Sequence, residues 1–159
     1  MSLTLTSPAF AHQGSIPQLY TCEGEDVSPA LGWSGAPAGT ATFALIVHDP
    51  DAPDPERPQR DYVHWVLYDI PGTVTGLPEG VTTSDLPRGV REGINDWQRT
   101  GYGGPCPPIG RHRYFFELHA LDAALGELAQ PTRRAVERAM EGRVLATAVL
   151  MGTYEKAGM

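Results

Sequence analysis

The sequence lacks an excess of basic residues and any long apolar run. Its 159 residues carry 12 Lys and Arg against 19 Asp and Glu, a formal net charge of -7. This balance argues against nucleic acid or an anionic membrane surface as a general partner. Residues 1–8 have neither the basic region nor the apolar core of a signal peptide, and no later segment has the length of a membrane span. We therefore expect a cytoplasmic protein without stable membrane insertion.

Cysteine is also scarce. The chain has only Cys22 and Cys106, too few for a zinc cluster built on cysteines or for a disulfide-rich scaffold. The two side chains can meet in space, so a disulfide stays open as an alternative. Because a cytosolic chain of this size does not need the crosslink, we expect two reduced thiols.

What the chain has in quantity is turn-forming residues and short β-type segments. A length of 159 residues predicts a single domain, 1–159, with a real core. The 18 glycines and 15 prolines imply many turns. One helix is expected at 132–140, where Pro131 and Thr132 suit a helix start and Gly142 an end. Strands are expected at 3–6, 31–33, 42–48, 62–70, 111–121 and 144–154. The predicted fold is mainly β, an antiparallel β-sandwich or a β-rich α+β fold.

Three of the segments that connect these elements have a marked composition or length. Residues 49–58 are rich in proline and are expected to form an extended, stiff loop. Residues 72–101 are long and irregular, with a short strand expected at 90–94, and loops of this length are often functional. Residues 101–110 contain four glycines and three prolines, a composition typical of a rigid turn with exposed backbone. This turn leads directly into the strand at 111–121, which we expect to be central.

The residues that can carry chemistry lie at the ends of these strands. Alternation places Tyr62 and His64 on one face of their strand, together with Val66 and Tyr68. It also places His112 and Tyr114 on one face of theirs, opposite His119. Asp49 ends the preceding strand and can lie beside His64, which would favour a charged imidazole that attracts an anion. Each residue taken alone is ordinarily structural.

Several separated motifs, in the same order, resemble one family over essentially the whole chain. They are the segment 49–53 (DPDAP), the segment 63–65 (VHW), the segment 103–108 (GGPCPP) and the segment 112–114 (HRY). Together they are similar to the phosphatidylethanolamine-binding protein family, also called Raf kinase inhibitor protein-like. The bacterial branch is the nearer match, through residues 20–26 (YTCEGED), 95–96 (ND) and 140–145 (MEGRVL).

The resemblance implies a central β-sandwich and a small surface pocket for phosphate-type anions such as a phospholipid headgroup. Carried onto this chain, the ligand-binding residues are Asp49, Pro53, Tyr62, His64, Gly104, Pro107, His112 and Tyr114. In the family pattern Asp49 supports His64, while His112 and Tyr114 supply hydrogen-bond donors. Pro53 and Pro107 form the rim, and the Ala52–Pro53 bond is a candidate for the cis form. The helix that closes the pocket of eukaryotic relatives has no counterpart after Tyr154, so we expect a more open pocket.

Three classes of function remain in competition. The first is non-catalytic binding of an anion or phosphorylated ligand, with no cofactor, used to recognise or inhibit a protein partner such as a kinase or protease. The second is a hydrolase that uses His64 or His112 as a base, against which the chain shows no Gly-x-Ser-x-Gly segment. The third is a metal site drawn from Asp49, Asp51, His64, His112 and His119, without the usual ligand spacings. A homodimer formed through residues 72–101 is a further expectation.

Overall fold

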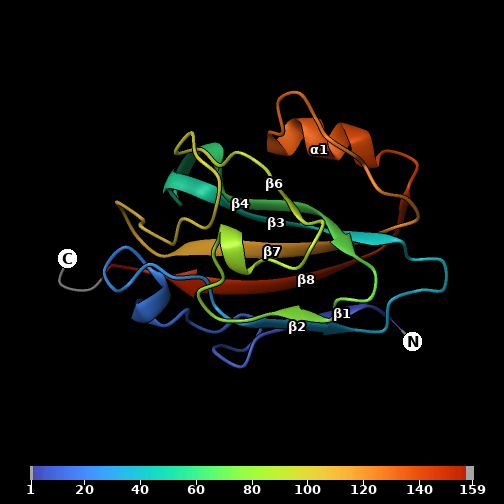
Figure 1. The fold of residues 1–159 in the computed structure, drawn as a ribbon. Coiled ribbons are helices and arrows are strands. Elements are labelled where there is room, and N and C mark those ends of the chain that lie inside the picture. Colours follow the sequence, from blue (N-terminus) through green and yellow to red (C-terminus); the bar gives the residue numbers. More distant parts are fainter. Residues whose placement is uncertain (1, 157–159) are drawn as a thin grey trace.

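The chain folds into three layers (Figure 1). The computed structural model describes residues 2–156. A small antiparallel sheet of order β1-β2-β5 lies below a larger sheet of order β6-β4-β3-β7-β8. The helix α1, Arg133–Met140, covers the opposite face of the larger sheet. The predicted mainly β fold is therefore correct. No helix within residues 2–156 is long and apolar enough to cross a membrane.

The strands follow the predicted segments, with differences at their ends. The small sheet contains β1 (Thr4–Thr6), β2 (Leu31–Ser34) and β5 (Gly76–Leu77). The larger sheet contains β3 (Thr42–Asp54), β4 (Arg57–Pro71), β6 (Arg91–Glu92), β7 (His112–Leu121) and β8 (Val144–Tyr154). Its central strand is β3, flanked by β4 and β7. The strand at 111–121 was expected to be central; it is an interior strand but not the middle one, because two strands, β4 and β6, lie beyond β3 on one side and β8 lies on its other side.

The proline-rich segment 49–58 is part of a long β3–β4 hairpin and not a separate loop. Paired positions continue to Asp54 and Arg57, beyond Pro53 and Pro58. The expected extended conformation is correct, but the expected loop is reduced to a turn. Prolines fit here because the ladder has several register shifts, and such irregular positions do not require every backbone N–H.

A bulge in this hairpin sets the direction of His64. Val47 pairs with Trp65 and His48 pairs with Val63, so His64 is an extra residue in β4. A bulge of this kind changes which face the following side chains occupy. The predicted common face of β4 is therefore wrong: Tyr62 and His64 line a pocket. Val66 and Tyr68 instead pack in the cluster beneath the helix.

Alternation along β7 agrees with the prediction. His112, Tyr114 and Phe116 are buried, whereas Arg113 is exposed. Tyr114 and Phe116 belong to the main core cluster between the two sheets, with Trp65 and Leu67 of β4. This layer is rigidly packed and is continuous with the pocket through Tyr114, so the pocket floor is built on the core.

The helix α1 matches its prediction closely. The Thr132 side chain caps it by accepting a hydrogen bond from the Ala135 amide at 3.2 Å. Val136 and Met140 are its buried residues and form a second cluster with β3 and β4. Gly142 follows with φ 76°, a conformation that favours glycine after a helix. We expected no pocket-closing helix after Tyr154. This expectation includes residues 157–159, which lie outside the described residues.

The two cysteines form a disulfide. The Cα atoms of Cys22 and Cys106 are 5.4 Å apart and the sulfurs are bonded, 84 positions apart in sequence. The expectation of reduced thiols was wrong. The reason is that segments 20–26 and 102–106 lie side by side: the Cys22 amide donates to the Pro105 carbonyl at 3.1 Å, and the Tyr102 hydroxyl donates to the Tyr20 carbonyl at 2.8 Å.

Candidate functional site

A pocket of about 380 Å³ opens where β3, β4 and β7 meet the turn at 101–110. Seven of the eight residues predicted from the sequence line it: Asp49, Pro53, Tyr62, His64, Pro107, His112 and Tyr114. The other lining residues are Ala52, Gln59, Arg60, Trp97, Cys106 and Pro108. The volume suits a small ligand.

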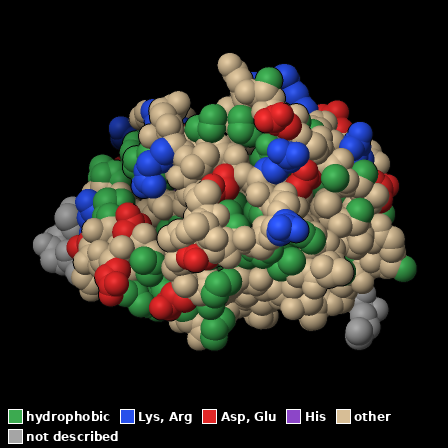
Figure 2. All heavy atoms as spheres, in the orientation of Figure 1, with side chains coloured by type: hydrophobic (Ala, Val, Ile, Leu, Met, Phe, Trp, Pro, Cys, Tyr) green, Lys and Arg blue, Asp and Glu red, His purple; other side chains and the backbone are tan. Residues whose placement is uncertain are grey.

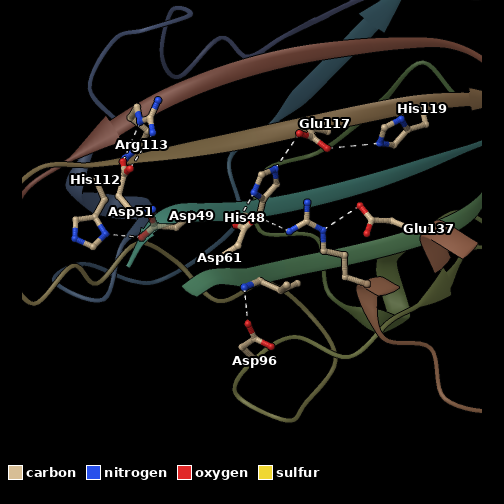
Figure 3. Close-up of polar contacts among 12 residues, drawn as sticks. His48, Asp49, Asp51, Asp61, Asp96, His112, Arg113, Glu117, His119 and Glu137 are labelled. Carbon is tan, nitrogen blue, oxygen red and sulfur yellow. Dashed lines mark hydrogen bonds and ion pairs between the residues drawn. The ribbon is translucent and has the colours of Figure 1, made fainter. Parts of the chain in front are cut away.

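Asp49 pairs with His112 and not with His64. Its carboxylate lies 2.5 Å from Nδ1 of His112, and both side chains are buried (Figure 3). The Asp49 carboxylate also accepts the Asp51 amide at 2.8 Å. Burial raises the pKa of Asp49, and the His112 hydrogen bond opposes this increase. The predicted support of His64 by Asp49 was therefore wrong: β3 lies between β4 and β7, and the Asp49 side chain meets His112 of β7 although its backbone is paired with Tyr62 of β4.

The other nitrogen of His112 is also used inside the protein. Nε2 lies 3.0 Å from the carbonyl oxygen of Pro53 and 2.9 Å from that of Ile109. Carbonyl oxygens only accept, so Nε2 carries a proton and donates to them. The His112 side chain is fully buried. It holds the Pro53 and Ile109 segments together and has no nitrogen left for a ligand.

His64 has the opposite character. Its Nδ1 lies 2.7 Å from the Gly103 carbonyl, and no carboxylate is among its hydrogen-bond partners in the described residues. Burial is the largest effect on this group and lowers the pKa of His64 to about 4, with the Gly103 hydrogen bond opposing it. The ring is therefore neutral near pH 7. Since Nδ1 donates to Gly103, Nε2 carries a lone pair.

Tyr114 provides the second polar group of the floor. Its ring lies edge-on to His64, with centroids 5.2 Å apart. The hydroxyl is buried and has no hydrogen-bond partner within residues 2–156. Burial raises the pKa of Tyr114, and the nearby charge of Asp49 raises it further. The Asp49 carboxylate acts on the hydroxyl proton without forming a hydrogen bond of good geometry, so the hydroxyl stays protonated and can donate to a ligand.

The rim combines prolines, aromatic rings and one arginine. The Ala52–Pro53 bond is cis, as predicted. Cys106 lines the pocket, so the disulfide is part of its wall. Gly104 is behind the wall: its amide donates to Asp26 at 2.7 Å, and it is absent from the lining.

Trp97 and Arg60 were missed from the sequence. Trp97 packs against Tyr62 and His64, with ring centroids 4.9 and 5.0 Å apart, and it is 38% exposed. The Arg60 guanidinium lies over the Tyr62 ring at 5.9 Å. The sequence signal for Trp97 was an aromatic residue directly after Asn95 and Asp96 in a long glycine-rich loop, since such loops often carry binding residues.

A second polar cluster lies on the outer face of the larger sheet (Figure 3). Buried His48 contacts Asp61 through Nδ1 at 2.7 Å and Glu117 through Nε2 at 2.9 Å. His119 lies next to Glu117, on the face opposite His112 as predicted, so it does not join the pocket. Within residues 2–156 no group of three or more His, Cys, Asp or Glu is arranged to hold a metal ion.

Asp51 also uses its carboxylate in hydrogen bonds inside the protein. Its carboxylate accepts from the Arg113 side chain through two atoms, at 3.0 and 2.9 Å, and from the Arg113 amide at 2.9 Å. Burial raises the pKa of Asp51, but the bonds from Arg113 outweigh this effect and leave it lowered. Asp51 thus anchors the start of β7 to the end of β3 and does not enter the pocket.

Comparison with known proteins decides the family. The family model described as "Phosphatidylethanolamine-binding protein" matches residues 6–155. The chain belongs to the phosphatidylethanolamine-binding protein family. Among its relatives, a UPF0098 protein of Methanothermobacter thermautotrophicus is 45% identical over 97% of this chain and 99% of the relative. A UPF0098 protein of Aquifex aeolicus is 44% identical over 94% of this chain and 86% of the relative.

Solved structures agree with this family. A homologue from Chlamydia trachomatis, described as a putative phosphatidylethanolamine-binding protein homologue, has a TM-score of 0.89 and 39% identity, covering 98% of both chains. YbcL of E. coli, described as a new member of the mammalian family, has a TM-score of 0.87 and 33% identity, covering 98% of this chain and 99% of YbcL. The resemblance predicted from the motifs is confirmed as bacterial-type family membership.

Proposed function

We propose that this family member binds a small phosphate-type anion, such as a phospholipid headgroup, in the pocket lined by His64 and Tyr114, without transforming it. Binding then serves recognition or regulation of a protein partner, a kinase or protease. The observation that carries the proposal is a pair of polar atoms at the pocket floor, Nε2 of His64 and the Tyr114 hydroxyl oxygen, that make no hydrogen bond within the described residues. The Tyr114 hydroxyl is buried and unsatisfied in the described chain. Buried polar groups are rarely left so, and a polar ligand would satisfy this one.

Charge at the rim supports an anion. The chain as a whole is acidic, with a net charge of -7, so attraction must come from nearby groups. Arg60 lines the pocket and Arg99 lies over the Trp97 ring at 5.8 Å. On the face shown in Figure 2, basic and acidic side chains are interspersed and form no large basic patch. This pattern suits a local anion site more than an extended polyanion.

The arrangement of the histidines favours binding over hydrolysis. A general base must have a free nitrogen within reach of a substrate. Both nitrogens of His112 are bonded inside the protein. Nδ1 contacts the Asp49 carboxylate, and Nε2 donates to backbone carbonyls and not toward a ligand. His64 has no carboxylate to stabilise the proton that it would accept. The proposal invokes no metal ion and no cofactor.

Three expectations stay predictions beside it. The protein partner and the homodimer stay predictions because the structure contains a single chain and therefore shows no contact between chains. The cytoplasmic location stays a prediction too, and the disulfide between Cys22 and Cys106 weighs against it. Disulfides persist mainly in oxidising compartments and are rare in the cytosol.

The proposal is tested by removing the Tyr114 hydroxyl. Calorimetric titration with inorganic phosphate and with phosphorylethanolamine should show binding to the wild-type chain. Tyr114→Phe should weaken it by about tenfold or more, because one charge-assisted hydrogen bond is worth about 1.5–3 kcal/mol. Tyr68→Phe is the matched control, since Tyr68 packs in the cluster beneath the helix. Equal affinity of the wild type and Tyr114→Phe would place the ligand elsewhere.

A further inference from the structure

His64 differs from an ordinary anion-binding histidine in what it presents to the pocket. Its Nδ1 is bonded to the Gly103 carbonyl at 2.7 Å, and the residue is 3% exposed. This bond fixes the tautomer, so a neutral ring presents the lone pair of Nε2. A lone pair repels the oxygens of a fully ionised anion. It attracts a ligand that brings a proton of its own.

The groups around His64 keep the ring in this state. Among the described residues that line the pocket, Asp49 is the one carboxylate, and it is bonded to His112 and the Asp51 amide. The other close side chains are cationic or neutral, so none of them stabilises an imidazolium at position 64. The ionisable groups that face or surround the ring come from three strands: His48 and Asp49 of β3, Arg60 and Tyr62 of β4, and His112 and Tyr114 of β7.

The pocket floor therefore offers one acceptor and one donor side by side. The acceptor is Nε2 of His64, and the donor is the unpartnered hydroxyl of Tyr114. Their rings are in edge contact, with centroids 5.2 Å apart. A phosphate that keeps one P–OH matches both: the P–OH donates to Nε2 while a charged oxygen accepts from Tyr114.

We infer that the pocket selects a phosphate with an ionisable proton, inorganic phosphate or a phosphomonoester, over a phosphodiester. This inference rests on the proposed function and narrows its ligand. A phosphomonoester has a second pKa near 6, so it can share a proton with Nε2 at neutral pH. A phosphodiester, including an intact phospholipid headgroup, has only accepting oxygens. It can bind only if His64 takes up a proton from solution.

The expected ratio of affinities for a monoester and a diester follows from the cost of protonating His64. With the pKa of His64 near 4, each pH unit above it adds about tenfold to the cost of charging the ring. The phosphodiester should therefore gain about tenfold in affinity for each unit that the pH falls from 7 to 5. The phosphomonoester, which supplies its own proton, should change much less over this range.

Two isomeric phosphate esters test the preference for an ionisable proton without a difference in ligand size. Ethyl phosphate is a monoester and dimethyl phosphate is a diester of the same formula. At pH 5.5 the monoester is mostly a monoanion, so both carry close to one negative charge. Calorimetric titration should show ethyl phosphate binding at least about tenfold more tightly than dimethyl phosphate. Comparison with inorganic phosphate in a third titration distinguishes free phosphate from an esterified ligand.

Two variants assign the selectivity to its residue. His64→Gln replaces the fixed lone pair with an amide that both donates and accepts, so the preference for ethyl phosphate should disappear. Tyr114→Phe should weaken both isomers and leave their ratio unchanged. Should the isomers bind wild-type protein equally and both depend on Tyr114, the selectivity is wrong while the proposed function stands. Should none of the three phosphates bind, the proposed function itself fails.

Discussion

At the scale of single residues, three buried histidines of one sheet have three different sets of partners. His112 is held between Asp49 and two backbone carbonyls. His64 has only a backbone carbonyl and is neutral. His48 lies between two carboxylates. An imidazole in the sequence thus indicates a polar site without indicating its charge, which depends on neighbours from other strands.

His48 makes stability depend on pH above neutrality. Burial lowers the pKa of His48, but hydrogen bonds to Asp61 and Glu117 outweigh it and raise the pKa from 6.5 to about 9. The folded protein therefore holds a proton that the unfolded chain releases, and this contribution is complete below pH 6.5. Chemical denaturation should show the free energy of unfolding falling by about 3 kcal/mol between pH 6.5 and 9.

The control for this prediction is His48→Gln, which keeps hydrogen-bonding capacity and removes the titration. Its free energy of unfolding should be nearly flat over the same pH range, although lower at pH 6.5. A wild-type curve as flat as that of the variant would mean that His48 is neutral in the folded state.

At the scale of elements, the pocket depends on two features of the backbone. The bulge at His64 places this side chain in the pocket and not beneath the helix. The turn at 101–110 closes the other side, and it is tied to segment 20–26 by the disulfide and by the Gly104 amide, which donates to Asp26. The position of this pocket wall therefore depends on segment 20–26, although that segment contributes no residue to the pocket lining.

Removal of the disulfide should affect stability and the pocket together. The Cys22–Cys106 bond closes a loop of 84 positions, and loss of such a crosslink typically costs about 2–5 kcal/mol because the unfolded chain gains freedom. Denaturant titration of a Cys22→Ser, Cys106→Ser variant should show a loss in this range. The tryptophan fluorescence of the folded variant should also change through the contribution of Trp97, since the pocket wall that includes Cys106 loses its anchor. An unchanged free energy of unfolding would contradict the role given to the crosslink.

At the scale of the whole molecule, the sequence predicted the fold and the lining of the pocket better than its chemistry. Local patterns located the main strands and α1, and alternation predicted the buried face of β7. Motif resemblance predicted seven lining residues. Each of these features can be recognised within a short segment of the sequence, without knowing which strands pair.

The errors share a physical cause, which is that pairing between strands cannot be read from one segment. A bulge of one residue at His64 leaves no mark in the alternation but reverses the face of Val66. The partner of Asp49 depends on which of the two neighbours of β3, β4 or β7, its side chain meets. The disulfide depends on contact between distant segments. Trp97 enters the pocket from a loop that has no periodic pattern.

The most direct test of the central claim is a crystal structure of the chain grown with inorganic phosphate. The account predicts density for a tetrahedral anion in the pocket, with one oxygen within about 3 Å of His64 Nε2 and another within the same distance of the Tyr114 hydroxyl. His112 should keep its bonds to Asp49 and to the Pro53 and Ile109 carbonyls. An anion bound through His112, or a pocket that stays free of phosphate at saturating concentration, would contradict the account.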